Sequence, residues 1–340
     1  MHSYDHATLQ MYLQRHVEGM GPLDKFEKFS DGQSNPTYLV SSGRKRFVLR
    51  AQPLGTLLPG AHRVDREFRV MQALAATPIP VPKVFHLSDG DTPLGSQFFV
   101  MEHIAGRVFW DPALPDQTPQ TRGAIYDAMN KALADLHDVR PDRIGLGDYG
   151  KPSGFFARQL RTWRAAFAAS QTEALPDADW LGAWLEEAKP ADDGSLSLVH
   201  GDFRIDNMMF APDAPTVAAL LDWELSTLGH PMSDLAYQCM HWRLPHKGVF
   251  KGLGGLDRKA LGLPLEDEYV AAYCTRRAIP APKDWTFYLA FAHFRFLAIL
   301  QGVLRRSLDG NASNPLGNDA VRDVIADLAL QGRALAQKAG

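Results

Sequence analysis

The sequence contains very little cysteine. Only Cys239 and Cys274 occur among its 340 residues, far apart and without CxxC spacing. Disulfide-stapled domains and structural zinc sites both depend on several suitably spaced cysteines. We therefore expect neither a disulfide framework nor a zinc site.

Charge of one sign and long hydrophobic runs are also scarce. The formal net charge is −3 and 22% of the residues are charged, which indicates no surface for nucleic acid or an anionic membrane. The first fourteen residues lack an apolar signal core. The most apolar segment, residues 288–300, is interrupted by His293 and Arg295 and is too short to cross a bilayer. We expect a cytoplasmic protein without nucleic-acid or membrane partners, and a buried acidic partner for Arg295.

Glycine-rich nucleotide loops of the common types are missing as well. No GxxxxGK[ST] sequence occurs, and the one match to GxGxxG, residues 145–150, follows a predicted helix and a polar turn. A dinucleotide-binding loop follows a strand and opens a helix. The sequence therefore does not indicate a P-loop protein or a dinucleotide fold.

What the sequence does contain is a change of pattern along its length. Because 340 residues are many for one compact core, we expect two lobes. Short strands and turns dominate the front, and helical spacing of apolar residues dominates the back. The predicted class is α+β, with an N-lobe of residues 1–103, holding a small sheet and a helix, and a mainly helical C-lobe of residues 104–340.

The predicted elements are as follows. Strands are expected at 26–29, 38–40, 46–50, 83–87, 97–103, 196–200, 207–210 and 217–222. Helices are expected at 61–76, 120–138, 154–170, 178–189, 233–242, 265–278, 284–308 and 318–338, and residues 1–20 are moderately helical in pattern.

Three oxygen-bearing side chains accompany the strands of the back portion. Asp202 follows one apolar strand, Asn207 begins the next, and Asp222 ends the third. One carboxylate can serve a substrate hydroxyl, and the other two groups can be ligands of a hard divalent cation. Phosphoryl transfer from a magnesium nucleotide requires these parts, so the pattern predicts a small-molecule kinase.

The loop after Asp202 carries further polar groups. Arg204 can reach the transferred phosphoryl group, whose oxygens suit a permanently charged guanidinium. For His200 we favour a structural role, in which the ring bonds the loop backbone. The simpler alternative is that these residues only form turns and cap a strand. Turn chemistry accounts well for residues 206–207 but less well for four polar groups bracketed by two strands.

At this point the sequence shows a resemblance. The runs HGDFRIDN at residues 200–207 and LDWE at 221–224 resemble the catalytic and metal-binding motifs of the aminoglycoside phosphotransferase family, which has a protein-kinase-like fold. The longer run at 221–237 is similar to one branch, the kinase-like domains fused ahead of certain acyl-CoA dehydrogenases and their free-standing bacterial relatives. The resemblance covers roughly residues 25–300 and implies an antiparallel N-lobe sheet.

The resemblance also implies roles for residues. It makes Asp202 the catalytic acid, places Mg²⁺ on Asn207 and Asp222, makes ATP the phosphate donor, and has Asp234 tie down the catalytic loop. For Asp234 the alternative is an ordinary acid at a helix start, favoured by the helix dipole.

The front of the chain supports the resemblance less specifically. Residues 30–35 occupy the position of the family's phosphate-covering loop, where backbone amides with Ser34 and Asn35 would cradle the phosphates. Arg50 stands where the family presents a phosphate-pairing lysine, and Glu67 would be its ion-pair partner. A plain hairpin turn and a surface glutamate are the alternatives.

Residues 100–106 look like the family's hinge. The adenine would bond backbone groups near Glu102 and Ile104, with Met101 packed behind it. A strand that runs into a glycine turn would give the same sequence, so both interpretations stay open.

The predicted function is therefore transfer of the γ-phosphate of ATP to a hydroxyl of a small molecule. The branch resemblance favours a hydroxy acid or hydroxyacyl-CoA as acceptor. One alternative is a nucleotide-binding module without catalysis, suggested by the reduced glycine loop and Arg50. Another is a metal-dependent hydrolase built on His200, Asp202 and Asp222, although further ligands at tight spacing are not evident. The acceptor, the choice between ATP and GTP, and the oligomeric state stay open.

Overall fold

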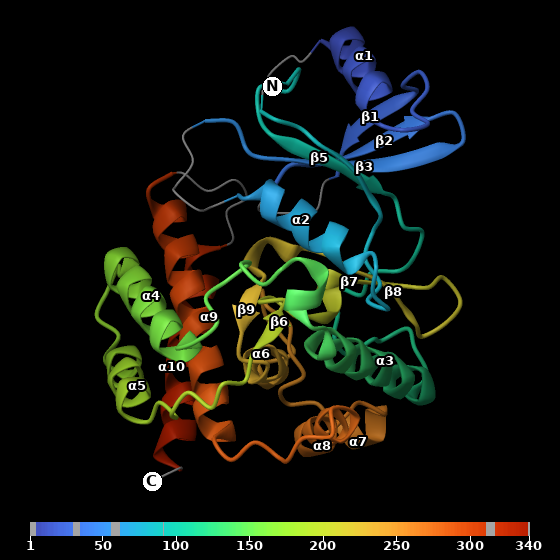
Figure 1. The fold of residues 1–340 in the computed structure, drawn as a ribbon. Coiled ribbons are helices and arrows are strands. Elements are labelled where there is room, and N and C mark those ends of the chain that lie inside the picture. Colours follow the sequence, from blue (N-terminus) through green and yellow to red (C-terminus); the bar gives the residue numbers. More distant parts are fainter. Residues whose placement is uncertain (1–4, 30–34, 56–61, 91, 311–316, 339–340) are drawn as a thin grey trace. The chain divides into compact units, whose positions relative to one another are not determined.

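The chain folds into two compact units. The computed structural model describes residues 5–29, 35–55, 62–90, 92–310 and 317–338. The first unit comprises Met1–Arg107, Ile144–Leu146 and Met208–Ser226, and the second comprises Val108–Arg143, Gly147–Asn207 and Thr227–Gly340. Figure 1 shows the sheet of the first unit and the helices of the second. The predicted α+β class, with a small sheet followed by a helix-rich back, is confirmed.

An antiparallel five-stranded sheet organises the first unit. Its strand order is β1-β2-β3-β5-β4. One helix, α1, precedes the sheet in sequence, and another, α2, lies between β3 and β4 in sequence. The bounds are α1 His6–His16, β1 Lys25–Lys28, β2 Thr37–Ser42, β3 Lys45–Ala51, α2 Val64–Leu74, β4 Val84–Leu87 and β5 Phe98–Glu102.

The alternation of side chains along β3 decides which way Arg50 points. Phe47 and Leu49 are buried in one apolar cluster with Leu9 and Leu13 of α1. Because successive strand residues point to opposite faces, Arg50 projects to the other face. There it meets α2. The alternation along β3 therefore places the positively charged side chain of Arg50 on the side of the sheet where α2 lies.

A hairpin from later in the sequence completes the first unit. Strand β7 Met208–Phe210 pairs with β8 Val217–Leu220. Arg107 and Phe210 exchange two backbone hydrogen bonds of 2.8 Å. A Cβ atom at Gly106 would lie only 2.4 Å from the Phe210 carbonyl oxygen, so only glycine allows this close approach. The hairpin is thereby held to the segment that follows the sheet.

The second unit is mainly helical and has one pair of short strands. Strand β6 pairs with β9, which the sequence did not predict, since three residues of mixed type give no periodic signal. The elements are α3 Pro119–Asp138, α4 Phe155–Ser170, α5 Pro176–Glu187, β6 Ser197–Val199, β9 Thr227–Gly229, α6 Met232–Arg243, α7 Arg258–Leu261, α8 Glu266–Arg276, α9 Trp285–Leu308 and α10 Asn318–Gln337, with 3₁₀ turns η1 Pro141–Ile144, η2 Ile205–Asn207 and, in the first unit, η3 Trp223–Leu225.

Helix α9 is the central helix of this unit. It packs against α10, α4 and α6, and Figure 1 shows α9 and α10 side by side. By length and composition alone, this helix of 24 residues could cross a membrane. However, 83% of its apolar 18-residue stretch is buried inside the protein. The apolar segment named from the sequence, residues 288–300, is shorter than this helix, so its length does not exclude a membrane span. Its burial instead identifies α9 as a helix of the protein core. None of the other described helices is both long and apolar enough to cross a membrane.

Candidate active site

The loop between β6 and η2 is anchored by a buried carboxylate. Asp234, in the first turn of α6, accepts hydrogen bonds from the backbone amides of His200 at 2.6 Å and Gly201 at 2.9 Å. His137 Nε2 lies 3.2 Å from the same carboxylate. Burial opposes ionisation, but these hydrogen bonds hold the pKa of Asp234 below its ordinary value. Asp234 therefore fixes the loop as the resemblance implied.

The histidine of this loop supports the backbone. The Nδ1 atom of His200 accepts a hydrogen bond from the amide of Asp202 at 3.3 Å, and its ring is buried. This agrees with the structural role that we favoured for His200.

Asp202 is held as a carboxylate by its neighbours. Its Oδ2 atom accepts a hydrogen bond of 2.7 Å from the Asn207 side-chain amide. The Arg204 Nε atom lies 3.5 Å from the other oxygen, Oδ1. Burial raises the pKa of Asp202, but the Arg204 charge and the Asn207 hydrogen bond outweigh it and leave the pKa below its ordinary value. An ionised carboxylate at this position can orient a hydroxyl and accept its proton.

Asn207 uses only one end of its amide in the protein. The nitrogen donates to both the carbonyl and the side chain of Asp202, at 2.8 and 2.7 Å. Within the described chain, no residue donates to its oxygen. That oxygen is of the type that Mg²⁺ prefers.

Arg204 also bonds Asp206, at 2.7 Å, so its guanidinium already interacts with two carboxylates.

In the first unit, Arg50 is the centre of a charge network. Its guanidinium lies 3.0 Å from Glu67, 2.5 Å from Asp222 and 3.6 Å from Glu224. The ion pair expected between Arg50 and Glu67 is therefore present, and Glu67 is buried rather than a surface residue. Glu224 was not among the predicted site residues, although it belongs to the motif at 221–224.

The charges of this network suit a divalent cation. One positive charge on Arg50 stands against three carboxylates, on Glu67, Asp222 and Glu224. Burial raises the pKa of Glu67 to about 7, against the opposing effect of Arg50. Asp222 and Glu224 offer carboxylate oxygens, the ligands that Mg²⁺ prefers, so these two residues fit the ion.

Asp222 has an uncommon backbone conformation. Its φ and ψ angles are +62° and +65°, in the left-handed region. A residue with a Cβ is strained there, and such strain concentrates at functional sites.

The hairpin register pairs Met208 with Leu220. The chain therefore enters from Asn207 and leaves toward Asp222 at the same end of the hairpin.

The residues expected to contact nucleotide are placed as follows. Ser34 lies outside the described residues. Asn35 is buried, and both ends of its amide are engaged, by Glu67 at 2.9 Å and by His62 at 2.9 Å. This leaves only its backbone for a phosphate. The Glu102 amide donates to the Lys83 carbonyl at 2.8 Å, so it is not available to a base.

Past the end of β5, the chain leaves a backbone donor. The amide of Ile104 makes no hydrogen bond to the described part of the chain. Met101 is half-buried on β5, and Val48 opposes it on β3. A free amide beside an apolar side chain is what the edge of an adenine ring requires.

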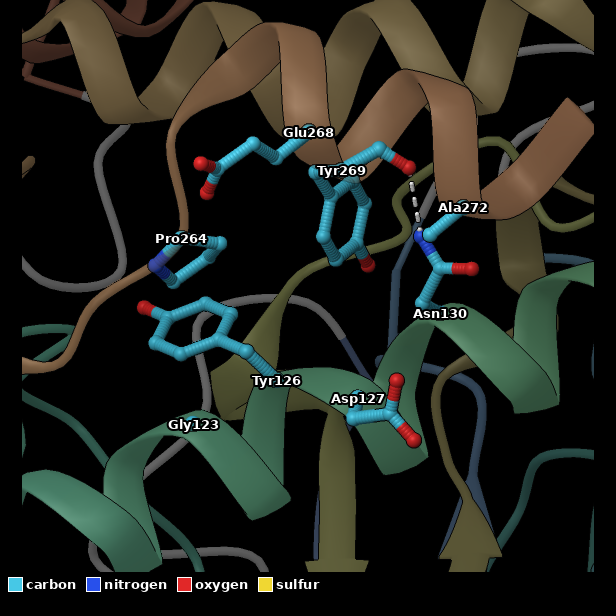
Figure 2. A pocket seen from close by; sticks show the side chains of 8 residues that line it. All are labelled: Gly123, Tyr126, Asp127, Asn130, Pro264, Glu268, Tyr269 and Ala272. Carbon is cyan, nitrogen blue, oxygen red and sulfur yellow. Dashed lines mark hydrogen bonds between the residues drawn. The ribbon is translucent and has the colours of Figure 1, made fainter.

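A hollow elsewhere in the second unit is not this site. It lies between α3 and α8, with Tyr126 and Tyr269 on its walls (Figure 2). None of the expected site residues lines it. The described residues also contain no group of three His, Cys, Asp or Glu able to hold a metal ion. The structure therefore gives no support to the metal-dependent hydrolase considered above.

Comparisons with known proteins agree on one family. The model of the phosphotransferase enzyme family matches residues 25–279. Mouse acyl-CoA dehydrogenase family member 10 is 40% identical over 332 residues, which cover 95% of this chain and 31% of that protein. The probable acyl-CoA dehydrogenase IBR3 of Arabidopsis thaliana is 43% identical, over 92% of this chain and 40% of its own. The chain thus spans about a third to two fifths of these curated relatives.

Solved structures show the same fold. The crystal structure of a candidate aminoglycoside phosphotransferase from Ralstonia eutropha is 44% identical, covers 99% of both chains and has a TM-score of 0.88. A ternary complex of aminoglycoside phosphotransferase APH(4)-Ia with AMP-PNP and hygromycin B is 15% identical, covers 97% of this chain and 98% of its own, and has a TM-score of 0.59. At that identity the second likeness concerns the kinase-like fold alone.

Proposed function

Because this chain belongs to the phosphotransferase enzyme family, we propose that it transfers the γ-phosphate of ATP to a hydroxyl of a small molecule. The observation that carries the proposal is the state of Asp202. Its carboxylate is kept ionised by Arg204 and Asn207, on a loop anchored by Asp234. A positioned carboxylate of this kind is what a kinase needs for the hydroxyl that attacks phosphorus.

In the proposed mechanism Asp202 orients the acceptor hydroxyl and takes up its proton as the new O–P bond forms, while the bond from the γ-phosphorus to the bridging oxygen breaks and ADP leaves with that oxygen. Asn207 and Asp222 would hold Mg²⁺, which neutralises charge on the phosphate oxygens when bound. Arg204 would add positive charge near the transferred group. Its position two residues after Asp202 supports this role, and its guanidinium lies near both Asp202 and Asp206.

For the nucleotide, we propose that Arg50 binds phosphate oxygens and that Glu67 positions it. Ser34 and Asn35 would cover the phosphates. Met101 and Ile104 would receive the adenine, with the Ile104 amide as donor and Met101 as an apolar wall, whereas the Glu102 amide is bonded to Lys83. An arginine in place of the family's lysine presents a planar fork of donors, which suits two phosphate oxygens at once.

We propose a hydroxy acid or hydroxyacyl-CoA as the acceptor. The support is the similarity to the relatives named as acyl-CoA dehydrogenases, of which this chain corresponds to about a third to two fifths. An acceptor that carries a hydroxyl and an acyl group would suit a protein of which an acyl-CoA dehydrogenase is another part.

The test is Asp202→Asn in the full chain. We expect phosphate transfer to a panel of hydroxy acids, hydroxyacyl-CoAs, sugars and aminoglycosides, followed as ADP release, to fall by about 10²- to 10⁴-fold. Binding of MgATP, followed by thermal shift, should survive, and a parallel assay with MgGTP tests the choice of donor. Asp213→Asn, in the exposed turn of the β7–β8 hairpin, is the control. Normal turnover by the Asp202 variant would refute the proposed role.

A further inference from the structure

An arginine in the core of the second unit has no acidic partner among the residues that the structure describes. Arg295 lies on α9 and is only 7% exposed. Among the described residues it makes no ion pair or hydrogen bond, so the buried acidic partner expected for it is not found in that part of the chain. Instead its guanidinium carbon lies 4.8 Å from the ring centre of Tyr237 and 5.5 Å from that of Trp163.

This environment leaves the hydrogen-bond donors of Arg295 unused. Aromatic rings stabilise a guanidinium through its flat faces. The N–H groups point outward from the edge of the plane, and here they meet no acceptor in the described chain. Leaving the donors of a buried guanidinium without acceptors is costly. The arrangement therefore indicates that an anion from outside the chain completes it.

A second buried group near Arg295 also lacks a partner. The Nε2 atom of His241, on α6, is buried and makes no hydrogen bond within the described chain. The His241 ring lies 4.6 Å from the rings of both Tyr237 and Phe296. Burial, with the nearby charge of Arg204, holds the pKa of His241 well below its ordinary value. The ring is therefore neutral and can donate or accept one hydrogen bond at this position.

These groups lie beside Asp202. Asp234, Tyr237 and His241 are spaced three and four residues apart, so they share one face of α6. Asp234 at the start of that face holds the catalytic loop. Burial, followed by the carboxylate of Asp202, raises the pKa of the Tyr237 hydroxyl, which places this phenol next to the proposed catalytic carboxylate. We call Trp163, Tyr237, His241, Arg295 and Phe296 the Arg295 cluster.

We infer that the Arg295 cluster binds the carboxylate of the acceptor, with Arg295 as a two-pronged donor and His241 as a further hydrogen-bond partner. The inference rests on the proposed function, since it identifies the acceptor as a free hydroxycarboxylic acid whose hydroxyl reaches Asp202. The rings of Tyr237 and Phe296 would contact the carbon chain between the two groups.

The test measures binding without phosphate transfer. The probes are 2-, 3- and 4-hydroxyhexanoate with the three matching hydroxyhexanamides, titrated calorimetrically into the full chain in the presence of MgAMP-PNP. We expect at least one acid to bind more than tenfold more tightly than its amide. Arg295→Gln should weaken that acid ten- to hundredfold and leave the amide unchanged, because only the acid offers a charged acceptor to the guanidinium.

Controls separate recognition from packing. Arg305→Gln changes an exposed arginine of the same helix and should leave both affinities unaltered. Arg295→Lys keeps the charge without the fork and should recover only part of the binding. Thermal unfolding checks that each variant is folded.

Several outcomes would overturn the inference. They are equal binding of acid and amide, equal weakening of both by Arg295→Gln, unfolding of both Arg295 variants, and absence of binding by all three acids. Tight binding of 3-hydroxyhexanoyl-CoA that is lost in Arg295→Gln would instead assign Arg295 to the phosphates of CoA. Since no phosphate is transferred in these experiments, their result is independent of whether Asp202 has the catalytic role proposed above.

Discussion

At the scale of single residues, Asp234 connects several parts of the second unit. It is fully buried and accepts from two consecutive backbone amides as well as facing His137. Turn propensity alone would leave the loop of residues 200–202 with several conformations. A single carboxylate removes that freedom, so the position of Asp202 depends on a residue that touches no substrate.

This dependence gives a prediction for Asp234→Asn. The new amide nitrogen would face backbone donors instead of accepting from them, so we expect a loss of about 2–4 kcal/mol in the free energy of unfolding. Turnover should fall more than the affinity for ATP. Urea unfolding and steady-state kinetics measure the two effects. Asp135→Asn, which alters an exposed ion pair on α3, should cost less than about 1 kcal/mol. Equal stability of the two variants would contradict the anchoring role.

At the scale of elements, the strongest periodic patterns were predictable and the shortest pieces were not. The apolar spacing at 61–76 indicated α2, which the structure confines to Val64–Leu74. The helix predicted at 120–138 is α3, where Thr118 caps the helix and Pro119 occupies its first turn. Strand β9 and helix α7, with three and four residues, are too short to carry a period.

The residues of the candidate site were likewise predictable only in part. Residue types and order indicated Asp202, Asn207 and Asp222, because chemistry restricts which side chains can serve. No local signal could reveal that Tyr237 lies beside Asp202 or that Arg295 rests on two rings. Within a helix such residues read as ordinary core positions, and an arginine there suggested an acid nearby. These contacts join elements distant in sequence, and only tertiary packing determines them.

Helix α9 should make the stability depend on pH. His293 is fully buried in it, donates to the Leu289 carbonyl, and has its pKa lowered from 6.5 to about 4 by burial. Between these values the unfolded chain binds a proton that the folded chain does not. Stability is therefore full above pH 6.5 and is lost as the pH falls toward 4.

The corresponding variant is His293→Gln, which removes the titrating group. Between pH 7.5 and 5.0, we expect the wild type to lose about 2 kcal/mol more than the variant does, from roughly 1.4 kcal/mol per pH unit below 6.5. Urea unfolding at both pH values measures the difference. His6→Gln, at an exposed position of α1, serves as the matched control. Identical pH dependence in wild type and His293→Gln would rule out this contribution.

At the scale of the whole molecule, the first unit is discontinuous in sequence. The β7–β8 hairpin and η3 are encoded within the stretch that otherwise builds the second unit, yet they supply Asp222 and Glu224 to Arg50. The Leu220 amide also donates to the Pro80 carbonyl at 2.8 Å. The first unit is therefore incomplete without residues 208–226.

A fragment experiment follows from this arrangement. Residues 1–107 alone should be poorly folded, whereas residues 1–107 joined by a flexible linker to 208–226 should gain cooperative structure, because the hairpin restores the partners of Arg50 and Arg107. Hydrogen exchange of the β3 and β5 amides measures the gain. The same fusion with Gly106→Val, whose side chain would collide with the Phe210 carbonyl, should not show it. Equal protection in all three fragments would contradict the prediction.

The interleaved order of these segments also matters while the chain is being made. About a hundred residues separate Arg107 from Met208, which corresponds to about 5–20 s of ribosomal elongation. During that delay Arg50 and Glu67 have emerged but Asp222 has not, so the nascent sheet presents an unfinished polar face. We expect chaperones of the trigger-factor type to stay bound to the nascent chain longest in this interval.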